Sequence, residues 1–185
     1  MELFEAIFSR QSIGEVRRDP VPRKVVEKLL AAAAQAPNHY KVFPWRFIVI
    51  SGTAREELGE VMAQSFVAQF PSVPPDALDK ERAKALRAPL IIAVGVDKPS
   101  LPKVSEVENI AAVAAACQNL LLAATALGLG AKWRTGAAAL DPLVKQWLGL
   151  EADQHLLGMI YIGYPAFEPQ PANRPGFEDH TTWKS

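Results

Sequence analysis

The sequence predicts a three-layer sandwich of the α/β or α+β class, with a sheet of about four strands between helices. Two observations lead to this prediction. Short apolar runs of strand length alternate with longer segments whose apolar residues recur at helical spacing. One stretch, residues 106–130, is apolar nearly all round, and a helix of that kind must be covered on all sides. The 185 residues fit one domain with a sizeable core.

Apolar spacing and boundary signals define the elements before this stretch. Helices are expected over residues 2–9, 22–36, 54–68 and 76–86, and strands over residues 47–50 and 90–96. Pro22 is a favoured first-turn residue of the second helix, and Pro37 ends that helix. Thr53 and Glu56 have the spacing of a capping box. Both strands are uncharged and therefore predicted to be buried.

The apolar stretch over residues 106–130 predicts the central helix. Alanine, the residue with the highest helix propensity, dominates it, and Gly128 and Gly130 provide the stop. An uncharged run of this length also fits a transmembrane helix. Weakly hydrophobic alanines, with Gln118 and Asn119 in the middle, favour instead the core of a soluble protein, or a core shared with a second subunit.

The chain after the central helix predicts two strands, one short helix and a tail. The strands are expected over residues 131–136 and 156–164, and Asp141 with Pro142 begins a helix that runs to Leu148. The tail, residues 165–185, contains four prolines, which prevent a helix or a central strand. Its large apolar residues are Phe167, Phe177 and Trp183. We therefore expect the tail to lie across a partner subunit, with Trp183 in a pocket there.

Composition argues against several partners and sites. The 20 basic and 20 acidic residues cancel, so no basic field attracts nucleic acid or an anionic membrane. The single cysteine, Cys117, is expected to be a small core residue, and the N-terminus does not resemble a signal peptide. A cytoplasmic protein is therefore expected. The three histidines are too scattered for a local metal motif, and no dinucleotide fingerprint follows a strand. An enzyme of this kind would take its reactivity from a bound cofactor.

Three clusters are candidate binding sites, and each has a structural alternative. Residues 9–12 (Ser-Arg-Gln-Ser) suit a phosphate, but a cation is also favourable at any helix C-terminus. Residues 132–135 (Lys-Trp-Arg-Thr) place cations beside an uncharged core, or are ordinary strand alternation. Residues 38–45 are rich in aromatic and hydrogen-bonding groups, or form a connector whose Trp45 fills the core.

Together these segments resemble the FMN-dependent nitroreductase family, in its small subgroup of NAD(P)H nitroreductases. The resemblance covers nearly the whole chain and rests on the order and spacing of six motifs. The motifs are Arg10-Gln11-Ser12, Ala36-Pro37-Asn38-His39 followed by Pro44-Trp45-Arg46-Phe47, Ala88-Pro89-Leu90-Ile91-Ile92, Gln118-Asn119-Leu120, Gly130 to Gly136, and Ile162-Gly163-Tyr164-Pro165. The resemblance implies an α+β, nitroreductase-like fold with a mostly antiparallel mixed sheet, to which a partner can add a strand. It also implies one FMN-binding domain over residues 1–185.

The resemblance further implies a homodimer with two FMN molecules at its interface, against which the central helices pack. The cofactor-binding residues that it implies are Arg10, Gln11, Ser12, Gln35, His39, Trp133, Arg134 and Thr135. In this scheme Arg134 opposes the phosphate, His39 comes from the partner subunit, and residues 123–128 border the nicotinamide nucleotide. No side chain is implied as an obligatory acid or base.

The implied reaction passes a hydride from NAD(P)H through flavin N5 to a planar acceptor such as a nitroaromatic or a quinone. Three residues depart from the family pattern: Lys41 and Phe43 replace an asparagine and a glutamine of larger members, and Gln35 replaces a frequent arginine. A neutral amide beside the flavin makes its reduction harder unless Lys41 or Lys132 substitutes. The alternatives are a flavin-binding dimer without turnover, and a related flavin chemistry on another acceptor.

Overall fold

The structure is a computed structural model that describes residues 1–137, 141–170 and 174–184. Its helices are α1 (Leu3–Ser9), α2 (Arg23–Ala33), α3 (Ala54–Gln69), α4 (Pro75–Lys84), α5 (Glu106–Ala126) and α7 (Pro142–Trp147), with short 3-10 helices η1 (His39–Lys41) and η2 (Glu178–His180). Its strands are β1 (Trp45–Ser51), β2 (Leu90–Val96), β3 (Gly130–Arg134) and β4 (His155–Gly163). The predicted order of helices and strands is therefore confirmed.

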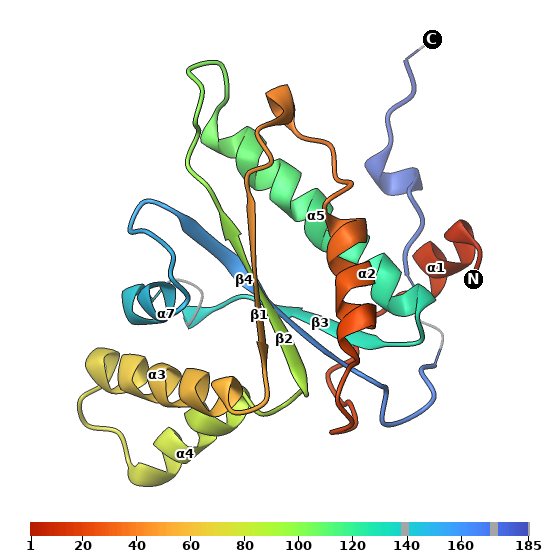
Figure 1. The fold of residues 1–185 in the computed structure, drawn as a ribbon. Coiled ribbons are helices and arrows are strands. Elements are labelled where there is room, and N and C mark those ends of the chain that lie inside the picture. Colours follow the sequence, from red (N-terminus) through yellow and green to blue (C-terminus); the bar gives the residue numbers. More distant parts are fainter. Residues whose placement is uncertain (138–140, 171–173, 185) are drawn as a thin grey trace.

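The four strands form one sheet in the order β1-β2-β4-β3, and every neighbouring pair is antiparallel. Among the described residues, parallel pairing is limited to an isolated bridge between Ser12 and Ala131. Helices α2 and α5 cover one face of the sheet, while α3, α4 and α7 group on the other side (Figure 1). The expected three-layer sandwich is thus confirmed, with a sheet that is antiparallel apart from that bridge.

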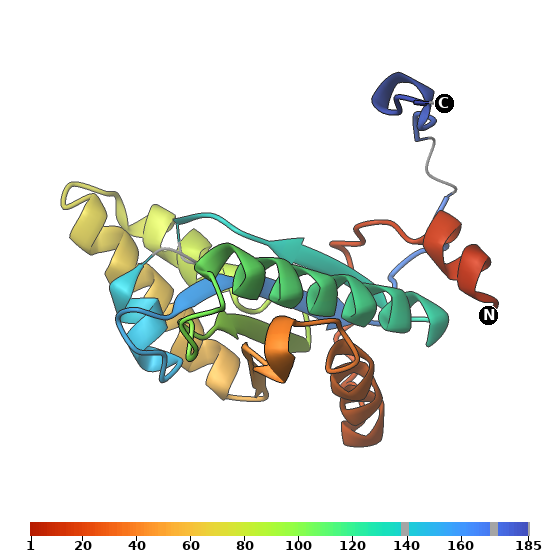
Figure 2. The same ribbon diagram turned by 90° about the horizontal axis from the view of Figure 1, so that it is seen from above.

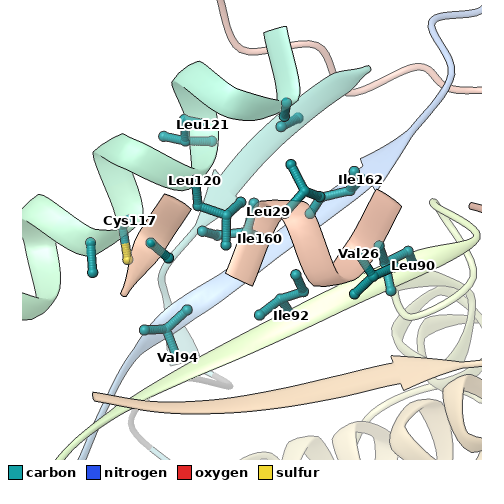
Figure 3. Packing of buried hydrophobic residues seen from close by; sticks show 14 of the residues in the cluster. Val26, Leu29, Leu90, Ile92, Val94, Cys117, Leu120, Leu121, Ile160 and Ile162 are labelled. Atoms are coloured by element: carbon teal, nitrogen blue, oxygen red, sulfur yellow. The ribbon is translucent and has the colours of Figure 1, made fainter. Parts of the chain in front are cut away.

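The central strand β2 supplies both layers of the core, because its side chains alternate between the two faces and all of them are buried. Ile92 and Val94 face α2 and α5, where they meet Leu29 and Leu120 (Figure 3). Ile91 instead belongs to the cluster beneath α3 and α7. The uncharged sequence of β2 therefore reflects burial on both sides.

Helix α5 is the central helix, and its start is fixed by a capping box that the sequence analysis missed. The Ser105 hydroxyl accepts from the backbone N–H of Glu108, and the Glu108 carboxylate accepts from the backbone N–H of Ser105. The helix ends at Ala126, and Gly128 takes the left-handed conformation at φ 72° as expected of a stop.

The chain alone does not cover α5 on all sides. Its length and composition would also suit a membrane span, but one face packs against the sheet as in a core helix. On the other face Val107 is 74% exposed, and Ala111 and Gln118 are exposed as well. Helical spacing places these three side chains on one stripe. This exposed stripe, in which Val107 and Ala111 are apolar and Gln118 is polar, remains available for a partner.

Three local predictions are wrong. Strand β1 is only partly buried, because it lies at the sheet edge, where Val49 is 43% exposed while Ile50 is buried. Thr53 does not cap α3 through its side chain; it has helical dihedrals itself, and its carbonyl accepts from Glu56. Pro22 likewise precedes α2 as its N-cap, and the helix ends at Ala33, three residues before the expected position.

The two ends of the chain carry exposed apolar groups. In α1, Phe4 and Phe8 are 70% and 74% exposed, and the tail leaves Trp183 84% exposed. Figure 2 shows α1 and the C-terminal segment standing away from the sheet. As expected, the described part of the tail forms only the short helix η2, while Pro171 lies outside the described residues.

Replacing Leu29 by alanine tests the α2–α5 layer. Leu29 has no exposed surface, so Leu29→Ala removes buried methyl groups and leaves a cavity. We expect it to lower the unfolding free energy by about 2–5 kcal/mol. The matched control, Leu101→Ala, changes a side chain that is 43% exposed and should shift stability by no more than about 0.5 kcal/mol. Equal losses in urea unfolding of both variants would contradict the assigned core.

Cys117 provides a second test of the same layer. Its side chain is fully buried in the core, and desolvation raises the pKa of the thiol to about 12. Because the thiolate is the reactive form, a disulfide reagent at pH 8 should leave the native protein unmodified over the time needed to label the unfolded protein completely. Rapid labelling of the native protein would show that α5 does not cover this thiol.

Candidate functional site

The segment that contains Arg10, Gln11 and Ser12 lies beside the first residues of β3. Ser12 forms the parallel bridge to Ala131, and the backbone N–H of Ile13 donates to the carbonyl of Ala131 over 3.0 Å. Because β3 follows α5 directly, this bridge fixes the segment near the C-terminal end of α5. The structure therefore places residues 10–12 beside the strand that carries Trp133 and Arg134.

The C-terminal chain lines the outer side of this segment. The guanidinium of Arg174 donates to the carbonyl of Arg10 over 2.7 Å, and the Gln11 amide donates to the carbonyl of Gln170 over 2.6 Å. Burial, and secondarily the charge of Arg174, lowers the pKa of Arg10. Two guanidinium groups so close together favour an anion between or beside them.

Strand β3 divides its side chains between the two faces of the sheet. Trp133 packs toward the core beneath α5, whereas Lys132 and Arg134 point to the face that carries α3 and α4. Arg134 lies over the ring of Tyr161, with its guanidinium carbon 5.3 Å from the ring centroid. Thr135 follows β3 and is exposed. The side chains of β3 alternate between the two faces as in any strand, and its two cations also line a cavity. Both alternatives given for residues 132–135 therefore apply.

Buried donors in β3 are unsatisfied. Among the described residues, no acceptor is present for the indole Nε1 of Trp133 or for Nε of Arg134. Buried polar atoms normally have partners, so each exception requires an explanation such as a bound group. The indole also crosses close to Gly158, where an added Cβ would lie 2.4 Å from Nε1. Only glycine leaves room for Trp133 there.

The cations of β3 lie at a cavity of about 480 Å³ between β3, β4, α3 and α4. Its apolar wall comes from Phe66, Phe70 and Met159, and its cationic wall includes Lys132, Arg134 and Arg87. Arg87, which lies in the turn after α4, is absent from the predicted site residues, whereas Lys132 belongs to the predicted basic cluster of residues 132–135. Arg87 is isolated in sequence, and only the pairing of β2 with β4 brings it near β3.

His39 lies at the opposite end of α5, whereas Gln35 follows α2 nearer the middle of α5, where the Asn119 amide donates to the carbonyl of Ala32 over 3.2 Å. His39 Nε2 is 3.3 Å from Oε1 of Glu108, which belongs to the first turn of α5. Bonds from Ser105 keep the pKa of Glu108 below its usual value, and the nearby His39 adds to this effect. The Gln35 amide donates to the carbonyl of Ala31 over 3.4 Å at the end of α2. The 21 residues of α5 span roughly 30 Å. Within one subunit, His39 and the segment that contains Arg10 therefore lie far apart.

The loop after His39 is strained. Tyr40, Lys41 and Phe43 all have positive φ values, between 49° and 55°, which is unusual for residues other than glycine. The side-chain oxygen of Asn38 accepts from the backbone N–H of Phe43 over 3.0 Å and holds the loop closed. The side chains of Tyr40 and Phe43 remain exposed as a result. Backbone strain of this kind is concentrated at binding sites.

The donor set fits an anionic flavin nucleotide better than a metal ion. In the described part of the chain, no group of three or more His, Cys, Asp or Glu side chains is placed to hold a metal. The guanidinium groups, the unsatisfied donors of β3 and the apolar wall suit a phosphate attached to an aromatic ring system.

Relatives of known sequence agree with this chemistry. The chain is 31% identical over 165 residues to YdjA of Escherichia coli K12, a provisionally named NAD(P)H nitroreductase, and the match covers 89% of each chain. It is 30% identical over 181 residues to YfhC of Bacillus subtilis, which has the same provisional name, with 97% of this chain and 93% of YfhC covered.

Solved structures show the same fold. A nitroreductase-like family protein from Bacillus cereus matches with a TM-score of 0.86 at 26% identity, covering 100% of this chain and 96% of the other. A provisionally named nitroreductase from Desulfovibrio desulfuricans, crystallised with FMN, matches with a TM-score of 0.78 at 26% identity over 100% and 98% of the two chains. The family model described as the Nitroreductase family matches residues 7–164. The chain therefore belongs to the Nitroreductase family.

Proposed function

We propose that this protein is an FMN-dependent oxidoreductase that takes a hydride from NAD(P)H and delivers it to a planar acceptor, a nitroaromatic or a quinone. The names of its relatives and the FMN-bound neighbour support the flavin and the donor. The observation that carries the proposal is the cationic, partly apolar cavity beside β3, with its unsatisfied donors. We further propose that the enzyme is cytoplasmic and uses the NAD(P)H of the cytoplasm as its electron donor.

The proposed role of the chain is to bind and orient the cofactor and to exclude water. Flavin supplies the hydride chemistry when bound. Arg10, Ser12 and Arg134 supply donors for the ribityl-phosphate end, while Thr135 lies past the end of β3 and lines the cavity. The indole of Trp133 packs into the core beneath α5 and so anchors β3, the strand that carries Lys132 and Arg134. No side chain in this scheme moves a proton in the hydride transfer.

The proposed enzyme is a homodimer, because a complete site requires residues from both ends of α5. Two α5 helices packed antiparallel along the exposed stripe of Val107, Ala111 and Gln118 would bring His39 of the partner subunit toward the Arg10 end. The same association would cover the exposed faces of Phe4 and Phe8 in α1. In the proposed dimer the tail from residue 165 crosses the partner and buries Trp183.

Flavin binding and reduction test the proposed chemistry. The purified protein should be yellow, or become so on addition of FMN, and anaerobic NADH or NADPH should bleach the flavin absorbance. Nitroaromatic or quinone acceptors should then reoxidise the reduced flavin, and steady-state assays with both substrates should show turnover. A protein that binds FMN but is bleached by neither donor would support the alternative of a flavin-binding dimer without turnover, in agreement with the neutral Gln35. Failure to bind FMN would contradict the proposal as a whole.

A charge in the α5 stripe tests the dimer. Ala111→Arg places a cation on the exposed apolar stripe, where its burial against a second copy would leave it unpaired. We expect this variant to sediment as a monomer. The matched control is Ala83→Arg, an exposed helical alanine of α4 on the other side of the sheet, which should sediment like the parent protein. A dimeric Ala111→Arg protein would place the interface elsewhere.

A further inference from the structure

We propose that a hollow between α2 and the end of β1, the α2 hollow, is a second binding site that takes a small aliphatic carboxylate. The hollow has a volume of about 540 Å³, which is in the range of small-molecule sites, and it shares no lining residue with the cavity beside β3. It lies where β1 ends and β2 begins, and β1 forms the edge of the sheet opposite to β3. The inference does not depend on the proposed function.

The floor of the α2 hollow is aliphatic. Figure 3 shows Val26 and Leu90 together at the contact of α2 with β2, and they are 7% and 2% exposed. Val21, Leu30 and Val49 add further aliphatic surface to the lining. No aromatic ring is present among the described residues that line the hollow, so a planar ligand finds no stacking partner there. The floor favours an aliphatic chain, which gains free energy in proportion to the apolar area that it buries.

Arg55 lines the same hollow and is held in a fixed orientation. Its Nε donates to the carbonyl of Gly52 over 3.2 Å, and its Nη1 donates to the carbonyl of Ala88 over 2.9 Å. The side chain is half-buried, and within the described part of the chain its Nη2 makes no hydrogen bond. The planar guanidinium is therefore positioned before a ligand arrives, with donors left for an anionic oxygen.

The turn between β1 and α3 makes this orientation possible. Gly52 has a φ of 59°, a left-handed conformation that glycine adopts without strain, and its carbonyl accepts from Arg55. The second carbonyl, that of Ala88, belongs to the segment just before β2. Two segments that are distant in sequence thus support one guanidinium at the α2 hollow.

The charges that line the α2 hollow leave an excess of positive charge. Arg23 pairs with Glu27 over 2.9 Å, so these two residues compensate each other. The other two lining cations, Arg18 and Arg55, form no ion pair with any carboxylate of the described residues. A carboxylate matches the planar fork of a guanidinium group, and the aliphatic floor accepts the chain attached to it. Because Arg18 is exposed and Arg55 is half-buried, Arg55 is the stronger contact.

The test uses octanoate and its neutral analogue octanamide, titrated calorimetrically into the full chain with and without saturating FMN. The parent protein should bind octanoate roughly tenfold to hundredfold more tightly than octanamide, as expected for a charge-assisted contact. Arg55→Gln should remove most of this preference, and Arg18→Gln should reduce it less. The matched control is Lys28→Gln, an exposed cation of α2 outside the hollow, which should bind both compounds like the parent. FMN should leave the octanoate affinity unchanged.

A variant that fills the α2 hollow provides a second measurement. Val49 is 43% exposed, so Val49→Trp adds volume to the hollow without entering the core, and it should block octanoate and octanamide alike. Thermal unfolding shows whether each variant folds. If Arg55→Gln fails to fold, Arg18→Gln and Val49→Trp decide the question, because both change exposed side chains.

Three outcomes overturn the proposal. The first is a parent protein that does not bind octanoate, or one whose affinity is unaffected by Arg55→Gln and Val49→Trp. The second is displacement of octanoate by FMN, which would place the ligand in the cofactor site. The third is binding of octanoate by Trp183→Ala alone, which would show that the tail of a second copy fills the α2 hollow.

Discussion

The packing of α5 on one face of an antiparallel sheet is the constraint on which the other features depend. Its small side chains allow close approach to β2 and β4, so that Leu120 and Val113 are fully buried. Strand β3 must begin where α5 ends, because Gly128 and Leu129 turn the chain back at once. The bridge from Ser12 to Ala131 then places the N-terminal basic segment at this end. One helix therefore separates the two halves of the candidate site.

Sequence reasoning succeeded where a signal was local or repeated. The uncharged residues of β2, the alanines of α5 and the Asp141 cap of α7 each have one favourable structural solution, and the structure has adopted it. Asp141 accepts from the backbone N–H of Leu143 over 2.8 Å. The order of the family motifs likewise indicated the fold, since motif spacing depends on the whole chain.

The same reasoning failed where the outcome depends on long-range contacts. The apolar run in β1 gives no sign that one side of the strand is left unpaired at the sheet edge. Thr53 and Glu56 have the spacing of a capping box, but the turn from Gly52 gives Thr53 helical dihedrals, and its side chain makes no cap bond. Arg87 has no sequence neighbour that suggests a binding role. Its position follows from strand register, in which Ile91 pairs with Tyr161.

The features that sequence reasoning missed are also those that cost stability. Three positive φ values after His39 and an unbalanced group of cations beside β3 each raise the free energy of the folded chain. Neither contributes to the packing of the two cores, which lie elsewhere. A ligand that binds only the folded protein stabilises the folded state by mass action. An anion bound among the cations beside β3 would also reduce their mutual repulsion. The fold is thus stabilised by α5 and β2, while its unfavourable features lie outside the two cores, at the two opposite ends of α5.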